Sequence, residues 1–311
     1  MNVLVFDIET VPDVASGRDL LALEGLNDAD TASAMFNLRR QEAGHDFLRL
    51  HLHQVVAISA VFRSRDQIAV WSLGEPEDPE KILLEKFFHL IEHFSPTLVS
   101  WNGSGFDLPV LHYRALLHGV AAPRYWDQGQ DDRNFKWNNY LSRYHERHTD
   151  LMDLLALYNN RAFVPLDQLA TLLGFPGKMG MSGAAVWEAW QQGDISGIRD
   201  YCETDVLNTW LVYLRFQLIR GALLAPDYEA ELVLVKDYLR REAHPHFLAF
   251  LQQWEDRHRL RQPGQATGPD AGSGDRGRQI WQEEDVPPGC RRTRWPLKSP
   301  PSVMMAGVSA G

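Results

Sequence analysis

Apolar residues in the first part of the chain form short runs of the kind found in β-strands. Residues 2–10 are rich in β-branched and aromatic side chains, which favour a pleated strand. Residues 54–63 and 67–73 have a similar composition, and the three residues between them make a connection of hairpin length. Residues 97–101 form a fourth short run. The pattern predicts four strands, of which the second and third form a hairpin.

Helical spacing appears between these runs and after them. Residues 79–94 carry apolar side chains at the spacing of an amphipathic helix. A glycine-rich turn at 102–105 is followed by a helical pattern to about Gly119, and residues 32–40 also have a helical pattern. The order β, β, β, α, β, α predicts an α/β fold with a mixed sheet flanked by helices.

The C-terminal half is rich in helical patterns, with glycine or proline at most joins. The predicted helices cover residues 151–158, 166–173, 184–192, 195–220 and 228–261. From Gln262 to Gly311 the chain is rich in Gly, Pro, Ser and Arg and shows no periodicity. We therefore expect one domain over residues 1–261 and a disordered tail over 262–311.

The composition is that of an ordinary globular protein, with 44% hydrophobic and 23% charged residues in a chain of 311. The two cysteines, Cys202 and Cys290, are too few for a disulfide framework or a cysteine zinc site. No basic leader and no apolar run of membrane-spanning length is present. We expect a cytoplasmic protein without a membrane partner.

Two acidic residues lie in the first predicted strand. Side chains alternate faces along a strand, so Asp7 and Glu9 point to one side while Phe6 and Ile8 point to the other. Two carboxylates on one buried face repel each other unless a cation lies between them. Carboxylate oxygens are preferred ligands of Mg²⁺ and Mn²⁺. The alternative is a strand whose acids face solvent at a sheet edge.

Two further segments place acids near helices. Asp107 follows the glycine-rich turn, where it could simply cap the next helix, and Asn102 could shape the turn. Tyr201 and Asp205 lie four residues apart in a predicted helix and therefore share a face. Taken alone, this pair could equally be a core aromatic residue and a surface acid.

The three segments together carry a family resemblance. The order Phe-Asp-Ile-Glu-Thr, then Asn-x-x-x-Phe-Asp, then Tyr-x-x-x-Asp resembles the three motifs of the DEDD superfamily of 3′→5′ exonucleases, in the subgroup with a tyrosine in the last motif. From Met1 to about Trp254 the chain resembles stand-alone bacterial proteins described as predicted 3′→5′ exonucleases related to the proofreading domain of family B DNA polymerases. Further segments that support the resemblance are residues 138–140, 143–145, 148–155 and 174–178.

The resemblance implies a ribonuclease H-like fold and a role for each matching residue. Asp7, Glu9, Asp107 and Asp205 would ligate two divalent cations, Mg²⁺ or Mn²⁺, which clamp the attacking and leaving oxygens of a phosphodiester. Tyr201 would orient the attacking water, because a phenol with a pKa of about 10 is a poor base. The substrate implied is a single-stranded 3′ end, DNA in preference to RNA, with nucleoside 5′-monophosphates as products.

Other residues are candidates for supporting roles. Asp150 precedes a predicted helix, where it could cap that helix or support the metal site from behind. Residues 124–148 interleave aromatic and basic side chains, as a groove for a single strand requires. The alternative is that these aromatics close the core. Within that stretch, Tyr140 and Arg143 are the candidate substrate contacts, and Asn102 is a further one.

The segment 174–180 contains three glycines and Lys178. Its first two glycines are separated by two residues where a Walker loop has four, and no Ser or Thr follows the lysine directly. This spacing argues against a nucleotide triphosphatase. Lys178 could lie on a lid that approaches a substrate phosphate, or the segment could be a plain loop. His244 and His246 flank Pro245 without a further nearby ligand pattern and are expected on the surface.

The formal charge of −10 argues against a protein that coats nucleic acid with a broad basic surface. It is compatible with an enzyme that binds one strand end in a metal-filled cleft, since bound cations reverse the local sign. Two rival hypotheses are an exoribonuclease resembling an oligoribonuclease and a catalytically idle nucleic-acid-binding module. Retention of four clustered acids counts against idleness, because their mutual repulsion costs stability.

Overall fold

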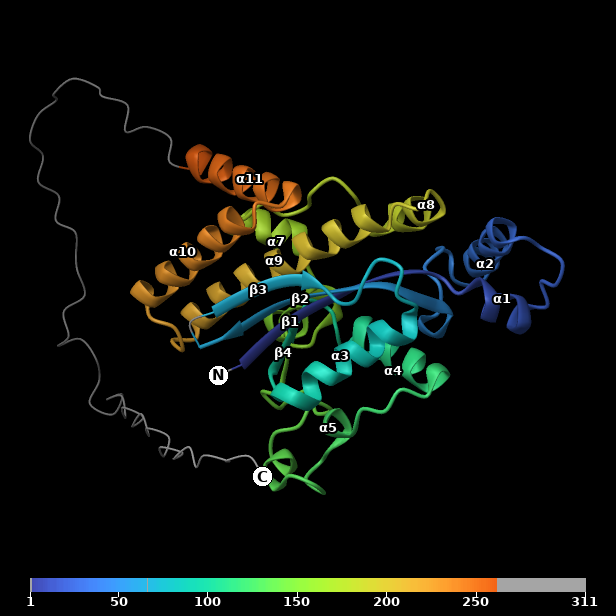
Figure 1. Cartoon of the computed structure of the whole chain (residues 1–311), viewed down its shortest axis with the longest axis horizontal. Coiled ribbons are helices and arrows are strands. Elements are labelled where there is room, and N and C mark those ends of the chain that lie inside the picture. The colour runs from blue at the N-terminus through green and yellow to red at the C-terminus, as the bar shows by residue number, and fades with distance from the viewer. Residues whose placement is uncertain (1, 66, 262–311) are drawn as a thin grey trace, which may run out of the picture. The chain divides into compact units, whose positions relative to one another are not determined.

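A mixed five-stranded sheet organises the chain (Figure 1). The computed structural model describes residues 2–65 and 67–261. The strands are β1 (Asn2–Pro12), β2 (His53–Ser64), β3 (Gln67–Ser72), β4 (Thr97–Ser100) and β5 (His148–Asp150). They lie in the order β3-β2-β1-β4-β5, in which β2 is antiparallel to its neighbours β1 and β3. The strands β1, β4 and β5 run parallel to one another.

The central strand β1 sends alternate side chains to two separate cores. Leu4, Phe6 and Ile8 belong to the core on one face, and Val3 and Val5 belong to the core on the other face. Asp7 and Glu9 continue the phase of the second set, because residues two apart on a strand share a face. The register shifts between Glu9 and Thr10, so the alternation changes just after the second acid.

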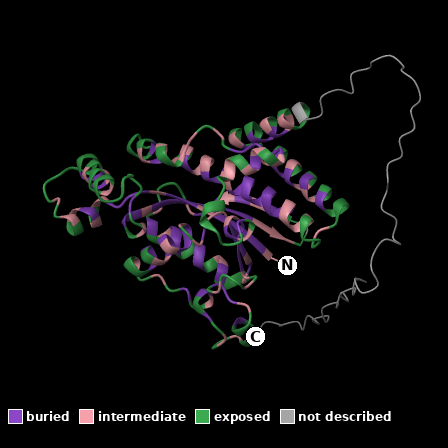
Figure 2. Ribbon diagram, turned by 180° about the vertical axis from the view of Figure 1, so that it is seen from behind, coloured by how far each residue is buried: buried purple, intermediate pink, exposed green. Residues whose placement is uncertain are grey.

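Helices cover both faces of this sheet, and Figure 2 shows the buried residues gathered along the sheet and the helix sides that meet it. On one face lie α3 (Glu80–Phe94), α4 (Asp107–His118) and α5 (Pro123–Trp126). On the other lie α7 (Leu166–Leu173), α9 (Ile195–Ile219), α10 (Ala225–Glu242) and α11 (Pro245–Arg261). The short helices α6 (Leu151–Leu155) and α8 (Val186–Gln191) flank them. This arrangement confirms the predicted α/β fold of the ribonuclease H-like type.

Two helices at the end of β1 pack mainly on each other. They are α1 (Val14–Leu21) and α2 (Asp28–Ala43). Four 3-10 turns complete the described chain, at Leu50–Leu52, Arg133–Lys136, Asn160–Ala162 and Gly183–Ala185. Helix α1 was not predicted from the sequence, and α2 is longer than the helix expected at 32–40.

A buried ion cluster joins α1, α3 and α4. Arg114 donates hydrogen bonds to both Asp13 and Glu80, and His118 contacts Glu80 as well. The N–H of Val55 on β2 also donates a hydrogen bond to the Glu80 carboxylate, at 2.7 Å. We call Asp13, Glu80, Arg114 and His118 the Arg114 cluster.

The long helix expected at 228–261 is two helices. Ala243 adopts a left-handed conformation with φ of 54°, and α11 starts at Pro245. Proline disfavours a helical conformation in the preceding residue, here His244, and ends the helix there. The predicted tail at 262–311 lies outside the described residues. Within the described chain, no helix has the length and apolar character needed to cross a membrane.

Candidate active site

The carboxylates of three distant segments meet on the α9 side of the sheet. Asp7 and Glu9 lie on β1, Asp107 is the first residue of α4, and Asp205 lies on α9. Strand β4 pairs with β1 only as far as Val5, so the edge of β1 beyond that point is open to other partners. There the N–H of Ile8 donates to Oδ1 of Asp107 at 3.2 Å.

Helix α9 packs on the face of β1 that carries Asp7 and Glu9, and it adds Asp205 to these acids. The thiol of Cys202 donates to the carbonyl oxygen of Asp7 at 3.5 Å and lies 3.8 Å from its Oδ2. The charge of Asp205 acts on both Asp7 and Glu9. The structure thus brings together the acids that are far apart in sequence. We call Asp7, Glu9, Asp107 and Asp205 the acidic centre.

The position of Asp107 depends on the turn that precedes α4. Asn102 has a left-handed φ of 66°, and its N–H donates to Asp150 at 3.0 Å. The N–H of Ser104 donates to the other oxygen of Asp150 at 2.8 Å. A side chain at Gly103 would place its Cβ 2.2 Å from Oγ of Ser100, so the tight turn requires glycine.

Asp150 thereby has two structural tasks. It accepts the N–H of Met152 at 3.1 Å and caps α6, as expected from its place before a helix. The same carboxylate holds the turn that carries Asp107, and its charge contributes to the raised pKa of Asp107. The helix cap expected from the sequence is therefore present, and support of a metal site by Asp150 stays a prediction.

Burial and mutual repulsion make the acidic centre hard to ionise. Burial first, then the charges of the neighbouring carboxylates, raise the pKa values of Asp7 and Glu9 well above their usual range. Burial likewise raises the pKa of Asp107 to about 7 and that of Asp205 to about 6. The charged groups that act most strongly on Asp7 and Glu9 are other carboxylates. Such a group is stabilised when a cation joins it.

The residues present fit divalent metal ions. Desolvated carboxylates without a matching basic side chain are an all-oxygen donor set, which hard cations such as Mg²⁺ and Mn²⁺ prefer. Among the described side chains, Asp7 and Glu9 also form a possible metal-binding group with Cys202, with ligand atoms within 4.8 Å of one another. Asp7 and Glu9 are the two acids whose ligand atoms lie within this distance of each other, and a metal-binding role for Asp107 and Asp205 stays a prediction.

Tyr201 lies one helical turn before Asp205, on the same side of α9. Its phenol interacts with the Asp205 carboxyl, and its ring packs beside Ile198 and Val186. Burial, followed by the charges of Asp205 and Glu9, raises the pKa of Tyr201 far above its usual value. The hydroxyl therefore keeps its proton and acts as a hydrogen-bond donor rather than as a base.

A third polar residue on this side of α9 was not identified from the sequence. The side-chain amide of Asn208 donates to the carbonyl of Gly177 at 2.8 Å, and its oxygen accepts the N–H of Gly177 at 3.0 Å. Asn208 thus holds the residue before Lys178, whose exposed side chain lowers the pKa of Asp205 by its charge. A polar residue three positions after Asp205, amid buried apolar neighbours, was the available signal.

A cavity of about 460 Å³ opens beside Glu9. Its aromatic wall contains Phe47 and Phe106, whose ring centroids are 5.5 Å apart, and the His53 ring lies 5.2 Å from that of Phe106. Trp187 on α8 lines the opposite part. Phe47 was not recognised from the sequence, because its polar surroundings at 41–46 show no periodicity.

The structure places Tyr140 away from this cavity, in the core beneath α5. The residue is 2% exposed, its ring stacks on Tyr125, and its hydroxyl donates to the carbonyl of Pro96 at 2.7 Å. This position corrects the expectation that Tyr140 contacts a base, since both its ring and its hydroxyl are already used. Tyr125 and Phe135 of the same stretch are also buried, whereas Trp126, Trp137 and Tyr144 are exposed, so the core-closing alternative holds for half of these aromatics.

Arg143 is half exposed and has internal partners. Its guanidinium pairs with Asp153 at 2.9 Å and lies 4.5 Å from the centre of the Tyr158 ring. Together with Ser104 and Asp150 it borders a small pocket behind the turn that carries Asp107. Arg143 therefore lies behind the acidic centre, where it steadies the segment after β5.

Comparison with known protein families gives one match. The model of a family described as a predicted 3′-5′ exonuclease related to the exonuclease domain of PolB matches residues 45–254, which is about two thirds of the chain. The match includes Asp107, Tyr201 and Asp205 and begins after Asp7 and Glu9. A comparison with curated proteins gives no match.

Proposed function

The chain belongs to this family of predicted 3′-5′ exonucleases, and from that premise we propose that it hydrolyses phosphodiester bonds at single-stranded 3′ ends with divalent cations. The proposed products are nucleoside 5′-monophosphates, and the proposed substrate is DNA in preference to RNA. The observation that carries the proposal is the meeting of four carboxylates with raised pKa values beside an aromatic cavity. Glu9 and Asp107 are buried, and Asp7 and Asp205 are partly exposed.

Asp7, Glu9, Asp107 and Asp205 would hold the cations. Two bound Mg²⁺ or Mn²⁺ ions would activate a water and neutralise the leaving 3′ oxygen. The chain supplies the orientation of the ligands. The N–H of Ile8 fixes Oδ1 of Asp107, and Cys202 holds the main chain of Asp7.

Tyr201 would orient the attacking water. Its hydroxyl stays a hydrogen-bond donor near neutral pH, because burial and nearby acids raise its pKa. Lys178 would face the substrate phosphate from the loop that Asn208 holds. An ammonium beside a phosphate contributes charge without a fixed geometry.

The cavity beside Glu9 supports a single-stranded end as the substrate. Its volume of about 460 Å³ lies in the range that accommodates one compact ligand, such as one unpaired nucleotide. The rings of Phe47 and Phe106 offer stacking surfaces, and stacking on an aromatic side chain tolerates every base. A base would have to leave its duplex to enter.

Labelled oligonucleotides test the proposal. Purified protein is incubated with 3′- or 5′-labelled single-stranded DNA and RNA of one sequence, with Mg²⁺, Mn²⁺ or a chelator. We expect metal-dependent shortening of DNA from the 3′ end, faster than that of RNA. Asp205→Asn should lower kcat about 10³-fold, because a metal-held charge contributes several kcal/mol to the transition state.

Asp237→Asn is the matched control. Asp237 is an exposed residue on the neighbouring helix α10 and pairs only locally, with Arg240 at 3.1 Å. This variant should retain wild-type kcat. Binding of DNA without shortening would favour the idle module, and shortening of RNA alone would favour the exoribonuclease. Shortening that survives the chelator would contradict the metal requirement.

A further inference from the structure

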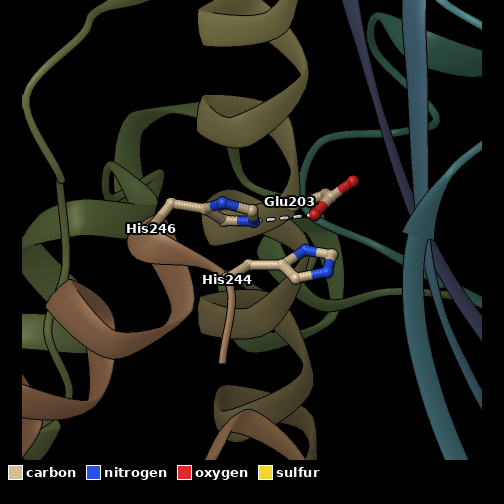
Figure 3. Close-up of side chains that lie close together, drawn as sticks. All are labelled: Glu203, His244 and His246. Atoms are coloured by element: carbon tan, nitrogen blue, oxygen red, sulfur yellow. Dashed lines mark hydrogen bonds and ion pairs between the residues drawn. The ribbon is translucent and has the colours of Figure 1, made fainter. Parts of the chain in front are cut away.

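A second group of metal-ligating side chains lies on another side of α9. Glu203 is two residues from Asp205, and at 3.6 residues per turn such neighbours point in nearly opposite directions. Its carboxylate faces His244 and His246, at the junction of α10 and α11. Figure 3 shows both imidazole rings directed toward the Glu203 carboxylate, and one ligand atom from each residue lies within 4.8 Å of the others.

The contacts of His246 are those of a metal ligand. Its Nε2 lies 2.8 Å from Oε2 of Glu203, and its Nδ1 lies 3.1 Å from Oδ1 of Asp200. An imidazolium donates to both of these carboxylates, whereas a neutral imidazole has one N–H and donates to only one of them. A metal-bound histidine commonly donates its other N–H to a carboxylate. With Asp200 in that role, the lone pair on Nε2 and the Oε2 of Glu203 are both available to one cation, whose bonds of about 2.0–2.2 Å to each atom would replace their present contact at 2.8 Å.

Glu203 is also held as a ligand would be. The hydroxyl of Ser72, on β3, donates to Oε1 of Glu203 at 2.7 Å, and this leaves Oε2 toward the histidines. Ligating carboxylates usually have such a hydrogen bond on their other oxygen. The residue is buried, with 8% of its surface exposed, so its orientation is restricted on all sides.

His244 provides the approach from solvent. It is exposed, and its ring is nearly parallel to that of Phe247, with centroids 5.1 Å apart. Pro245 separates the two histidines, and the left-handed turn at Ala243 brings both of them to one side of the helix junction. An ion could therefore enter past His244 and keep one coordination position for water.

We propose that Glu203, His244 and His246 bind a transition-metal ion of the Zn²⁺ class. Two imidazole nitrogens and one carboxylate oxygen suit Zn²⁺, whereas Mg²⁺ prefers oxygen donors alone. The ion would join α9 to the junction of α10 and α11. This site is separate from the acidic centre and does not depend on the proposed nuclease activity.

Metal titration of the tag-free full-length protein tests the site. Millimolar Mg²⁺ is kept in excess to occupy the acidic centre, and Zn²⁺ is titrated against a chromophoric chelator. The wild type should bind one more equivalent than His244→Ala, or bind it at least 100-fold more tightly. With free Zn²⁺ at 100 times Kd, the wild-type Tm should rise by roughly 5–10 °C, and the variant should lose this shift.

Two variants and one spectrum make the result specific. Asp200→Asn, which keeps the ligands, should weaken Zn²⁺ binding about 10-fold. His45→Ala removes an exposed histidine just after α2 and should leave binding unchanged. Equal binding by the wild type and His244→Ala overturns the proposal. So does a Co²⁺ spectrum whose bands are those of thiolate charge transfer and are unchanged in His244→Ala, which would assign the bound ion to a cysteine in place of the histidines.

Discussion

Two groups of buried carboxylates in this chain are built in opposite ways. In the Arg114 cluster, the guanidinium of Arg114 lies between Asp13 and Glu80, and all three side chains are at most 6% exposed. Its Nε and Nη2 donate to Glu80 at 2.7 and 2.6 Å. In the acidic centre, the strongest charged neighbours of Asp7 and Glu9 are other acids.

The pKa values of the two groups diverge accordingly. Burial acts to raise the pKa of Asp13, but hydrogen bonds from Ser16 and Arg114 outweigh it and hold the pKa below its usual value. Burial raises the pKa of Asp107 to about 7. Where the chain supplies its own cation, buried acids serve the structure. Where it supplies none of comparable strength, the acids are the proposed ligands of a cation from outside.

Loss of the internal cation should have the largest effect. Arg114→Ala leaves the carboxylates of Asp13 and Glu80 buried without their partner, so we expect the free energy of unfolding to fall by about 3–5 kcal/mol. Urea unfolding measures this change. The control is Arg240→Ala, which removes the exposed pairs with Asp237 and Glu255 and should cost below about 1 kcal/mol. Equal losses would mean that burial does not distinguish the two pairs.

In the acidic centre, removal of a charge should stabilise the metal-free protein. Between the usual pKa of an aspartate and the raised value of about 7 for Asp107, the folded state binds more protons than the unfolded state. Stability of the wild type without metal should therefore fall as the pH rises through this window.

Asp107→Asn removes one of these charges. At pH 8 without metal, it should raise the free energy of unfolding by roughly 1–3 kcal/mol, since one pKa unit is worth about 1.4 kcal/mol. The gain in stability should vanish near pH 4. It should reverse when Mn²⁺ is added, because only the wild type then offers the ion all four carboxylates of the acidic centre. Thermal unfolding with chelator or Mn²⁺ measures both. A variant less stable than the wild type at pH 8 would show that the acidic centre is not under repulsion.

Lys178 is the basic side chain that the described chain does bring near Asp205, and Asn208 holds its loop. If this positioning matters for the proposed activity, Asn208→Ala and Lys178→Ala should each lower kcat about 10-fold. The double variant should lose little more than either single variant, because the effects of residues that act together are not additive. Single-turnover assays well below Tm measure this coupling. Independent, multiplying losses would indicate that Asn208 affects kcat by a route other than the position of Lys178.

Tyr140 offers the smallest effect and a direct contrast with the acids. Its buried hydroxyl already has a partner, the carbonyl of Pro96. Tyr140→Phe should therefore lower the free energy of unfolding by about 1 kcal/mol without changing the Kd for single-stranded DNA. A higher Kd for the variant in a binding titration at matched salt would instead indicate that Tyr140 contacts the substrate.

The local features of the acidic centre could be read from the chain itself. The pairing of Asp7 with Glu9 on one strand face and of Tyr201 with Asp205 on one helix face follows from fixed backbone repeats. The break before α11 was equally local, and Pro245 was its signal. Periodicity alone overlooked it, because the apolar spacing continues on both sides of the proline.

Contacts between distant segments could not be read in this way. Tyr140 was expected to be a substrate contact and is in the core, because an aromatic beside arginines has the same local sequence in a groove and in a core. Phe47 lines the cavity beside Glu9 because the pairing of β2 with β1 brings the segment before His53 next to the end of β1. His246 was expected on the surface and instead meets Glu203, 43 residues away.

The sequence by itself determined which side chains share a strand face or a helix turn, because those relations depend only on the repeat of the backbone. The tertiary structure alone decided which of them lose water and which charges come within reach of one another. Desolvation and Coulomb interactions depend on spatial neighbours, and in this chain the decisive neighbours come from β1, α4 and α9.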